Sequence, residues 1–154
     1  MSARDLVLDS RALSALLDPK KPDHEAAKHV LATRLAARAL SDTDQDRPLF
    51  YVPALVVYEV RRGVLKRENR RLLTQLDRFL RTHAQVEPFD QATAEAAAAL
   101  WVTRSREGRP AGELDLLILA TAATIGADVV TADDGFPTVE GVTLWRWPAL
   151  AGAA

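Results

Sequence analysis

The sequence contains no cysteine. Without thiols the chain can form no disulfide bond, no thiolate metal site and no cysteine nucleophile, which agrees with a reducing compartment. It also lacks any apolar run that approaches the roughly 18 residues of a membrane span. The residues before Asp9 include Arg4 and Asp5 and only three consecutive apolar positions, too few for a secretory signal. We therefore expect a cytoplasmic protein that has no membrane partner.

An excess of charge of one sign is also missing. Lys and Arg number 20 and Asp and Glu number 21, which gives a formal net charge of −1. Along the chain the charges segregate, because residues 61–81 hold eight basic and two acidic residues, whereas residues 112–140 hold six acidic residues and no Lys or Arg. This distribution suits a protein that binds phosphates and cations together. The alternative is that residues 61–81 form the solvated face of a helix.

The composition is that of an ordinary folded protein. Hydrophobic residues make up 48% of the chain and charged residues 27%, which excludes a disordered chain. At this length roughly two-thirds of the surface of the extended chain can be buried. The sequence shows no internal repeat and no linker. We expect a single domain that spans residues 1–154.

Short apolar runs alternate with longer helical patterns. This alternation predicts an α/β sandwich around a mainly parallel sheet. Ligands bind at the carboxyl ends of the strands in such sheets, so residues that follow a strand are candidate site residues. Residues 41–48 are polar and predict a surface loop. The predicted strands are residues 6–8, 50–52, 86–89, 128–132 and 142–147, and the predicted helices are residues 11–17, 24–40, 54–66, 69–82, 91–107 and 113–125.

Four aromatic residues are predicted to lie in the core. Trp145 and Trp147 fall on one face of the last predicted strand, where we expect core packing rather than base stacking. Trp101 and Tyr58 lie in predicted helices and are also expected to be core residues.

Motifs for proteolysis and nucleotide hydrolysis are absent. His24 and His29 are five residues apart, whereas the zinc-protease helix needs a spacing of four. The glycine-rich residues 108–112 lack the Lys-Ser/Thr pair of a phosphate-binding loop and the strand that precedes it. His83 has no nearby Ser or Asp pattern that indicates a catalytic triad.

Four acidic residues stand in apolar surroundings. Asp9 follows the first predicted strand, Glu59 lies within an apolar helix, Asp115 lies in the first turn of another, and Asp133 follows the fourth strand. Each has a structural alternative. Asp9 and Asp133 could cap a helix or turn, Asp115 is favoured by the helix dipole, and Glu59 could pair with Arg62 or Arg11.

Considered together, the four acids favour a metal site. Carboxylates that converge at the end of a sheet repel one another unless a cation neutralises them, and hard oxygen ligands select Mg²⁺ or Mn²⁺. Such an ion can lower the pKa of a bound water and stabilise the charge that develops on a phosphodiester. The pattern therefore indicates a nuclease.

The same residues lie within longer motifs. Asp9-Ser10 follows a strand, and Glu59 follows Pro53 in an apolar helix. Residues 108–120 read Gly-Arg-Pro-x-Gly-x-x-Asp-Leu-Leu-Ile-x-Ala, and residues 129–136 read Val-Val-Thr-x-Asp-x-x-Phe. In this order the motifs resemble those of PIN-domain ribonucleases, most closely the VapC-type toxins of bacterial type II toxin–antitoxin pairs. The resemblance runs from Leu6 to about Trp147.

The resemblance implies a three-layer α/β/α fold with a parallel sheet, Mg²⁺-dependent endoribonuclease activity, a homodimer, and inhibition by a cognate antitoxin protein. Asp9, Glu59, Asp115 and Asp133 match the catalytic, metal-binding acids of the family, although the pair Asp133-Asp134 leaves the fourth acid ambiguous by one residue. Two further matches imply residues that orient the ligands, namely Ser10 and Thr131.

We therefore expect an endoribonuclease toxin that uses Mg²⁺ or Mn²⁺ and leaves a 5′-phosphate and a 3′-hydroxyl, an outcome that the family supports. Arg11 departs from the Asn or Ser usual in the family. Two alternatives stay open: an inactive PIN-like module that binds RNA or protein, and an RNA-processing nuclease that is not a toxin. The residues expected to bind the RNA backbone are Arg61, Arg62, Lys66, Arg67, Arg70 and Arg71.

Overall fold

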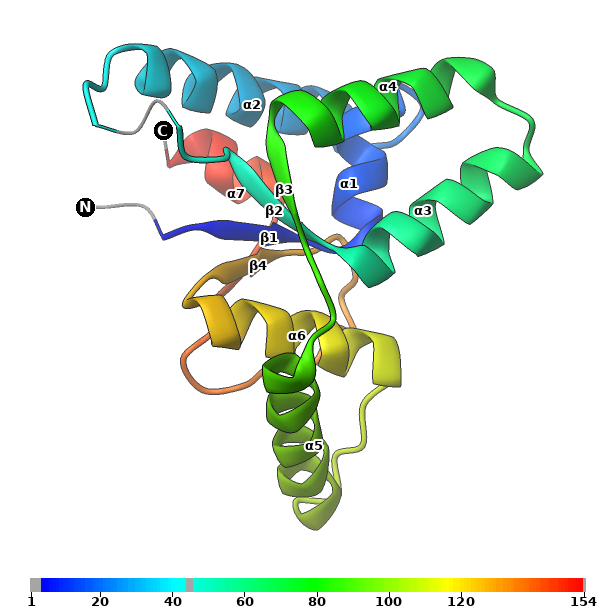
Figure 1. The fold of residues 1–154 in the computed structure, drawn as a ribbon, viewed down its shortest axis with the longest axis vertical. Helices are drawn as coiled ribbons and strands as arrows, with labels where there is room; N and C mark the ends of the chain where they lie inside the picture. Colours follow the sequence, from blue (N-terminus) through cyan, green and yellow to red (C-terminus); the bar gives the residue numbers. More distant parts are fainter. Residues whose placement is uncertain (1–3, 44–45, 154) are drawn as a thin grey trace.

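Five parallel strands pair in the order β3-β2-β1-β4-β5, so the first strand of the chain lies at the centre of the sheet (Figure 1). The computed structural model describes residues 4–43 and 46–153, so residues 44 and 45 of the predicted loop lie outside the described residues. The strands are β1 (Leu6–Leu8), β2 (Phe50–Pro53), β3 (Ala84–Glu87), β4 (Asp128–Val130) and β5 (Leu144–Trp145).

Helices cover both faces of this sheet and confirm the predicted three-layer α/β/α sandwich (Figure 1). Helices α1, α2, α4 and α7 lie on one face, and α5 and α6 on the other. Helix α3 follows β2 and packs against α1 and α4. None of the described helices is long and apolar enough to cross a bilayer. The helices are α1 (Ser10–Leu17), α2 (His24–Ala39), α3 (Ala54–Lys66), α4 (Arg70–Thr82), α5 (Gln91–Arg106), α6 (Glu113–Ile125) and α7 (Trp147–Gly152).

The central strands are buried throughout because helices cover both of their faces. Strand β1 pairs with β4 so that Leu8 lies opposite Val130. The pairing continues one residue further, since the Asp9 N–H donates to the Val130 carbonyl oxygen at 3.1 Å. The residues that follow β1 and β4 therefore meet at the same edge of the sheet, and this edge carries Asp9 and Thr131.

The third strand is displaced by two residues from its prediction and covers Ala84–Glu87 instead of 86–89. Its register is set by pairing with β2, in which Phe50 lies opposite Ala84 and Pro53 opposite Glu87. The strand is at the edge of the sheet and is only partly covered, so its hydrophobic pattern was a weak guide to its ends.

The prediction of a last strand over residues 142–147 was too long. Strand β5 contains only Leu144 and Trp145, and Trp147 begins helix α7. Trp147 is fully buried, packs edge to face on Phe50 at 5.7 Å, and donates its indole N–H to the Ala12 carbonyl oxygen at 3.0 Å. Trp147 is thus a core residue, as predicted, but in a helix rather than a strand.

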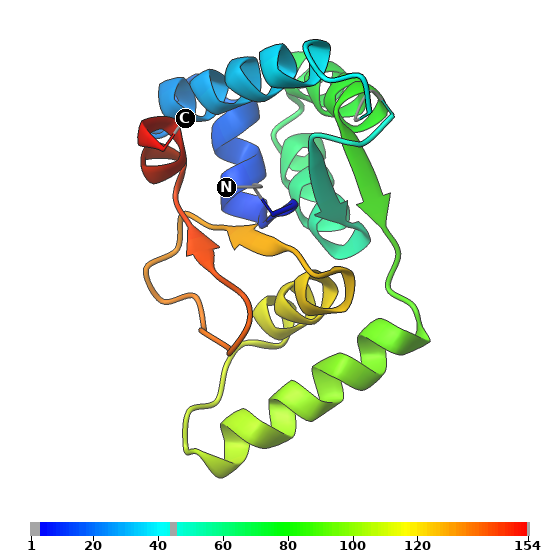
Figure 2. The same ribbon diagram turned by 90° about the vertical axis from the view of Figure 1, so that its left-hand side faces the viewer.

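Two other aromatic predictions were wrong. Trp101 is 53% exposed and Tyr58 is 62% exposed. Trp101 lies on α5, the outermost helix, whose alanine-rich face packs on α6 (Figure 2). The Tyr58 ring is covered on one side by the guanidinium of Arg62, which lies 5.1 Å from the ring centroid. Helices α3 and α5 each pack on their neighbouring helices through other side chains, so the rings of Tyr58 and Trp101 are left exposed to solvent.

Asp128 is a buried acid that joins β4 to β5. Its carboxylate accepts the Thr143 N–H and the Trp145 indole N–H, each at 3.1 Å, and lies 3.1 Å from the Arg4 guanidinium. Every one of these contacts holds the edge of the sheet together, so Asp128 has a structural role among the acids of residues 112–140.

Replacing Asp128 with Ala should lower the free energy of unfolding by about 3 kcal/mol, because two donors lose their buried acceptor. Urea denaturation measures the loss. Asp134→Ala is the matched control, since Asp134 is exposed and only pairs with Arg146 at the surface, where such pairs contribute little. Equal losses in the two variants would contradict this structural role.

Candidate active site

The four candidate acids come from four separate parts of the fold. Asp9 follows β1 and is the N-cap of α1, where its Oδ1 accepts the Ala12 N–H at 2.7 Å. Asp133 lies in the loop after β4, Asp115 in the first turn of α6, and Glu59 within α3. All four approach the edge of the sheet where β1 and β4 end.

Asp9 is the most buried of these acids, with 4% of its surface exposed. Its pKa is raised to about 6, chiefly by burial and to a lesser extent by the negative charges of Asp115 and Asp133, while hydrogen bonds from Thr131 and Ala12 oppose the rise. A carboxylate with this pKa is mostly ionised at pH 7 at a cost to folding.

Asp115 shows the same crowding from the other side of the site. Burial raises its pKa, as do the charges of Asp133 and Glu59, while Arg11 lowers it. The electrostatic coupling therefore links Asp9 to Asp115 and Asp133, and Asp115 to Glu59. The structure brings all four predicted acids into one electrostatic group.

The structure distinguishes the two neighbouring acids at 133 and 134. Asp133 accepts the Gly135 N–H on its Oδ1 at 2.9 Å and acts electrostatically on Asp9 and Asp115. The side chain of Asp134 is 97% exposed and pairs with Arg146 at 2.6 Å. Asp133 is thus the acid that faces the site.

The two residues expected to orient the acids lie beside them. The Thr131 hydroxyl hydrogen-bonds the Asp9 side chain and accepts the Asp133 N–H at 3.0 Å, so it links two of the four acids. The Ser10 hydroxyl is buried and has no hydrogen-bond partner among the described residues. It remains available to a ligand.

The donor set suits a hard divalent cation. All four groups are carboxylates, and their mutual repulsion would fall if a cation lay between them. In residues 4–43 and 46–153, no group of three or more His, Asp or Glu side chains already lies close enough to hold one metal ion. The partly exposed side chains of Glu59 and Asp115 would have to turn toward Asp9.

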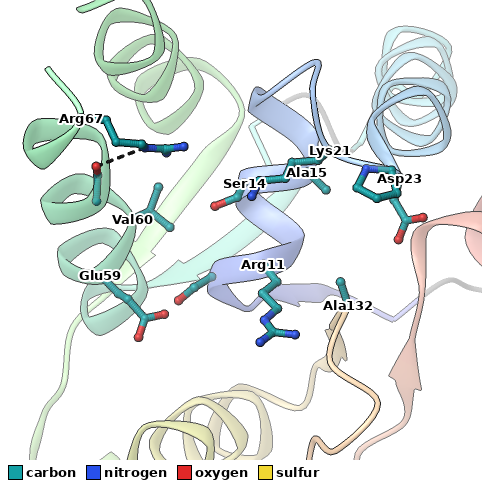
Figure 3. A pocket seen from close by; sticks show the side chains of 12 residues that line it. Arg11, Ser14, Ala15, Lys21, Asp23, Glu59, Val60, Arg67 and Ala132 are labelled. Carbon is teal, nitrogen blue, oxygen red and sulfur yellow. Dashed lines mark hydrogen bonds between the residues drawn. The ribbon is translucent and has the colours of Figure 1, made fainter. Parts of the chain in front are cut away.

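A cavity of about 690 Å³ lies beside this site, and Glu59 is the one of the four acids that lines it. In Figure 3 the side chains of Glu59 and Arg11 both extend toward one end of it, near Ala132, and Arg67 lies further along α3. The sequence flagged Arg11 but gave no signal for this cavity, because its walls come from segments far apart in the chain. The lining residues are Ser10, Arg11, Ser14, Ala15, Lys21, Pro22, Asp23, Glu59, Val60, Gly63, Arg67 and Ala132.

Of the six basic residues expected to bind the RNA backbone, Arg67 alone lines this cavity. Arg61 donates to Asp77 at 2.6 Å and so joins α3 to α4. Arg62 lies over the ring of Tyr58. Lys66, Arg70 and Arg71 are exposed. The basic segment therefore includes structural contacts as well as residues free to meet a ligand.

Comparison with known proteins gives one family. The model of the PIN domain family matches residues 6–142. No curated protein matches the chain. Several solved structures share its fold. A DNA-bound VapBC complex from Salmonella typhimurium is 18% identical, with a TM-score of 0.71 over 94% of this chain and 98% of the other.

Two further structures are similar. FitAcB from Neisseria gonorrhoeae is 24% identical, with a TM-score of 0.63 over 92% of this chain and 97% of the other. VapC20 from Mycobacterium tuberculosis, described as a toxin that cleaves the sarcin–ricin loop, is 20% identical, with a TM-score of 0.63 over 86% of this chain and 92% of the other. At these identities the similarity shows the fold.

The raised pKa of Asp9 predicts that Asp9→Asn stabilises the metal-free protein. The pKa of about 6 in the folded protein exceeds the ordinary value of 3.8. Ionisation of this carboxyl therefore lowers the free energy of unfolding progressively as the pH rises from about 4 to 6, and the full loss is present above pH 6. Asn keeps the N-cap. Urea denaturation in chelator should show a gain of about 3 kcal/mol at pH 7.5 that disappears below pH 4.

Asp90→Asn is the matched control at another N-cap. Hydrogen bonds from Thr93 lower the pKa of Asp90, so its carboxylate contributes stability above pH 4 and loses that contribution as the pH falls. The control should therefore be less stable than the parent at pH 7.5. If Asp9→Asn also loses stability at pH 7.5, the raised pKa assigned to Asp9 is wrong.

Proposed function

The chain belongs to the PIN domain family, and from this premise we propose that it is a metal-dependent endoribonuclease that acts as the toxin of a type II toxin–antitoxin pair. The observation that carries the proposal is the crowding of four carboxylates at one edge of the sheet, where Asp9 has a pKa of about 6. This crowding opposes folding, and a role in binding a cation accounts for it.

We propose Mg²⁺ as the cation, with Mn²⁺ as the second candidate. Asp9, Asp115 and Glu59 would hold it, and Asp133 would hold either a second ion or the attacking water. Bound there, the cation would lower the pKa of a water molecule and stabilise the charge that develops on the phosphodiester. The partly exposed positions of Glu59 and Asp115 leave them free to adjust to the cation and the substrate.

The protein's own residues then orient the reaction. Gly135 holds Oδ1 of Asp133, which leaves Oδ2 to accept a proton from the attacking water. The water oxygen forms a bond to phosphorus in line with the bond to the 3′-oxygen, which breaks. The 3′-oxygen takes a proton from solvent, and the products are a 5′-phosphate and a 3′-hydroxyl. Thr131 keeps Asp9 and Asp133 in place during these changes.

An antitoxin protein is the proposed partner. Support comes from the solved structures with the same fold, because VapBC from Salmonella typhimurium and VapBC2 from Rickettsia felis are bound to DNA as complexes. A short reading frame directly upstream that encodes a protein able to suppress the growth effect would identify the partner.

A homodimer is the proposed assembly. Trp101 and Val102 are exposed by 53% and 37% on the outermost helix α5 (Figure 2). Aromatic side chains are enriched in protein interfaces, and a second copy of the chain would cover Trp101.

The proposed nuclease predicts that the purified protein cleaves RNA with Mg²⁺ or Mn²⁺ and that a chelator stops it. Asp115→Asn should lower the cleavage rate by at least about 100-fold, because it removes a charged cation ligand. Gel analysis of cleaved RNA measures the rate, and induced expression at matched protein levels measures growth inhibition.

Asp134→Asn is the control for this experiment, since it makes the same change at an exposed acid outside the site. It should cleave RNA and inhibit growth like the parent. Cleavage that resists the chelator, or toxicity that survives in Asp115→Asn, would refute the metal-site assignment.

The homodimer predicts that Trp101→Glu shifts the protein toward monomer in light scattering, because it places a charge in an apolar contact. Arg106→Glu, at an exposed position on the same helix, controls for added negative charge. A monomeric parent protein, or a variant that remains fully dimeric, would contradict a dimer through this surface.

A further inference from the structure

The cavity beside the acids is a groove between α1 and α3. On α1 its wall is formed by residues at positions 10, 11, 14 and 15, and on α3 by residues at 59, 60, 63 and 67. These spacings place each set on one face of its helix. The two faces lie opposite each other, because α1 packs on α3. Residues 21–23, in the loop before α2, also line it.

Basic side chains from three elements line this groove. They are Arg11 from α1, Lys21 from the loop before α2, and Arg67 after the end of α3. The acids on the wall are Glu59 and Asp23. Basic groups therefore occur along the whole groove, while Glu59 lies at the end that joins the other carboxylates.

These basic groups are weakly engaged within the protein. No hydrogen bond or ion pair is found for the side chain of Arg11 or Lys21 in the described part of the chain. Arg67 lies 3.9 Å from Asp18 and donates to the Gly63 carbonyl oxygen at 3.3 Å. Arg11 also lies in the first turn of α1, where the helix dipole disfavours a positive charge. Its attraction to Asp115 offsets part of that cost, and its guanidinium remains able to contact a ligand in the groove.

Glycine keeps the wall of the groove open at Gly63. A Cβ added at this position would meet no atom within 4 Å. Glycine inside a helix costs roughly 1 kcal/mol relative to alanine, and no steric reason for it appears in the fold. The empty space beside Gly63 belongs to the groove.

The length of the groove can be estimated from α3. Glu59 and Arg67 are eight residues apart, which is about 12 Å along a helix axis. This length matches roughly three stacked nucleotides at about 3.4 Å each. The axes of packed helices lie about 8–10 Å apart, a spacing that suits a single strand better than a duplex.

We propose that the groove between α1 and α3 binds the sugar–phosphate backbone of a single RNA strand adjoining the bond to be cleaved. Arg11 contacts the phosphate nearest the carboxylates, and Lys21 and Arg67 contact phosphates further along. The unpartnered Ser10 hydroxyl and Ser14 offer hydrogen bonds to phosphate or 2′-hydroxyl oxygens. This inference rests on the proposed nuclease function and specifies where its substrate lies.

The experiment measures RNA binding without cleavage. In an Asp115→Asn background, a fluorescent pool of random-sequence single-stranded 12-mers is titrated with protein at several salt concentrations. Lys21→Gln combined with Arg67→Gln should weaken binding by at least about tenfold and lower the slope of log K against log salt by about 1.4, since each phosphate contact contributes about 0.7. Arg11 stays unchanged because it also acts on Asp115.

Lys28→Gln combined with Arg106→Gln is the matched control. It removes the same charge from exposed positions on α2 and α5, outside the groove, and should leave the slope unchanged. The charge-retaining pair Lys21→Arg and Arg67→Lys should restore binding. Equal effects of the groove and control variants would overturn the proposal, because they would reflect only total charge.

Gly63→Leu tests the groove without changing charge. Leucine favours the helix and fills the space beside it, so folding should persist while RNA binding weakens at least about tenfold. Unchanged binding in a folded variant would overturn the proposal. A second result would also overturn the proposal. If the Lys21→Gln, Arg67→Gln variant lost binding to a twelve-residue polyglutamate peptide but bound RNA like its parent, the groove would be assigned to an acidic protein segment.

The proposed nuclease and the proposed groove fail in different ways. If the parent protein cleaves RNA and the groove variants bind like the Asp115→Asn parent, the groove assignment alone is wrong. If the parent never cleaves RNA with Mg²⁺ or Mn²⁺ but the groove variants lose binding, the groove assignment holds and the nuclease is refuted.

Discussion

The gathering of four carboxylates at one edge of the sheet, with Asp9 buried among them, is the constraint on which the site depends. The parallel pairing of β1 with β4 brings the residues after both strands together, so Asp9 lies beside the segment that leads from Val130 to Asp133. Helices α3 and α6 add Glu59 and Asp115 to the same region. A fold that only had to be stable would place apolar or neutral residues at this edge, because each buried charge opposes folding.

Local structure limits how far these acids can move apart. Asp9 is tied to α1 by its cap to Ala12, and the Thr131 hydroxyl connects it to the backbone of Asp133. The same helix α1 that Asp9 caps also supplies one wall of the groove. Helices α1 and α3 thus carry both site acids and groove residues. An RNA strand bound in the groove would therefore lead toward the acids. The net charge of −1 conceals this arrangement of opposite charges.

The sequence predicted the parts of the structure that depend on local chemistry. The apolar runs located β1, β2 and β4, and the Asp at position 90 predicted a cap that accepts the Thr93 N–H at 2.9 Å. The motifs located the four acids. The exposed ring of Trp101 and the helical position of Trp147 could not be predicted, because they depend on which neighbours cover them. The groove was hidden for the same reason, since its walls are distant in sequence.

Burial, together with the neighbouring acids, makes the ionised form of Asp9 unfavourable, and a bound cation would offset both effects. The most direct test is a carbon-13 NMR titration of the Asp9 carboxyl carbon, with and without Mg²⁺. We expect a metal-free pKa of about 6 and a clear decrease when Mg²⁺ is added, because the cation favours the ionised form. A pKa near the ordinary 3.8 that does not respond to Mg²⁺ would contradict this expectation.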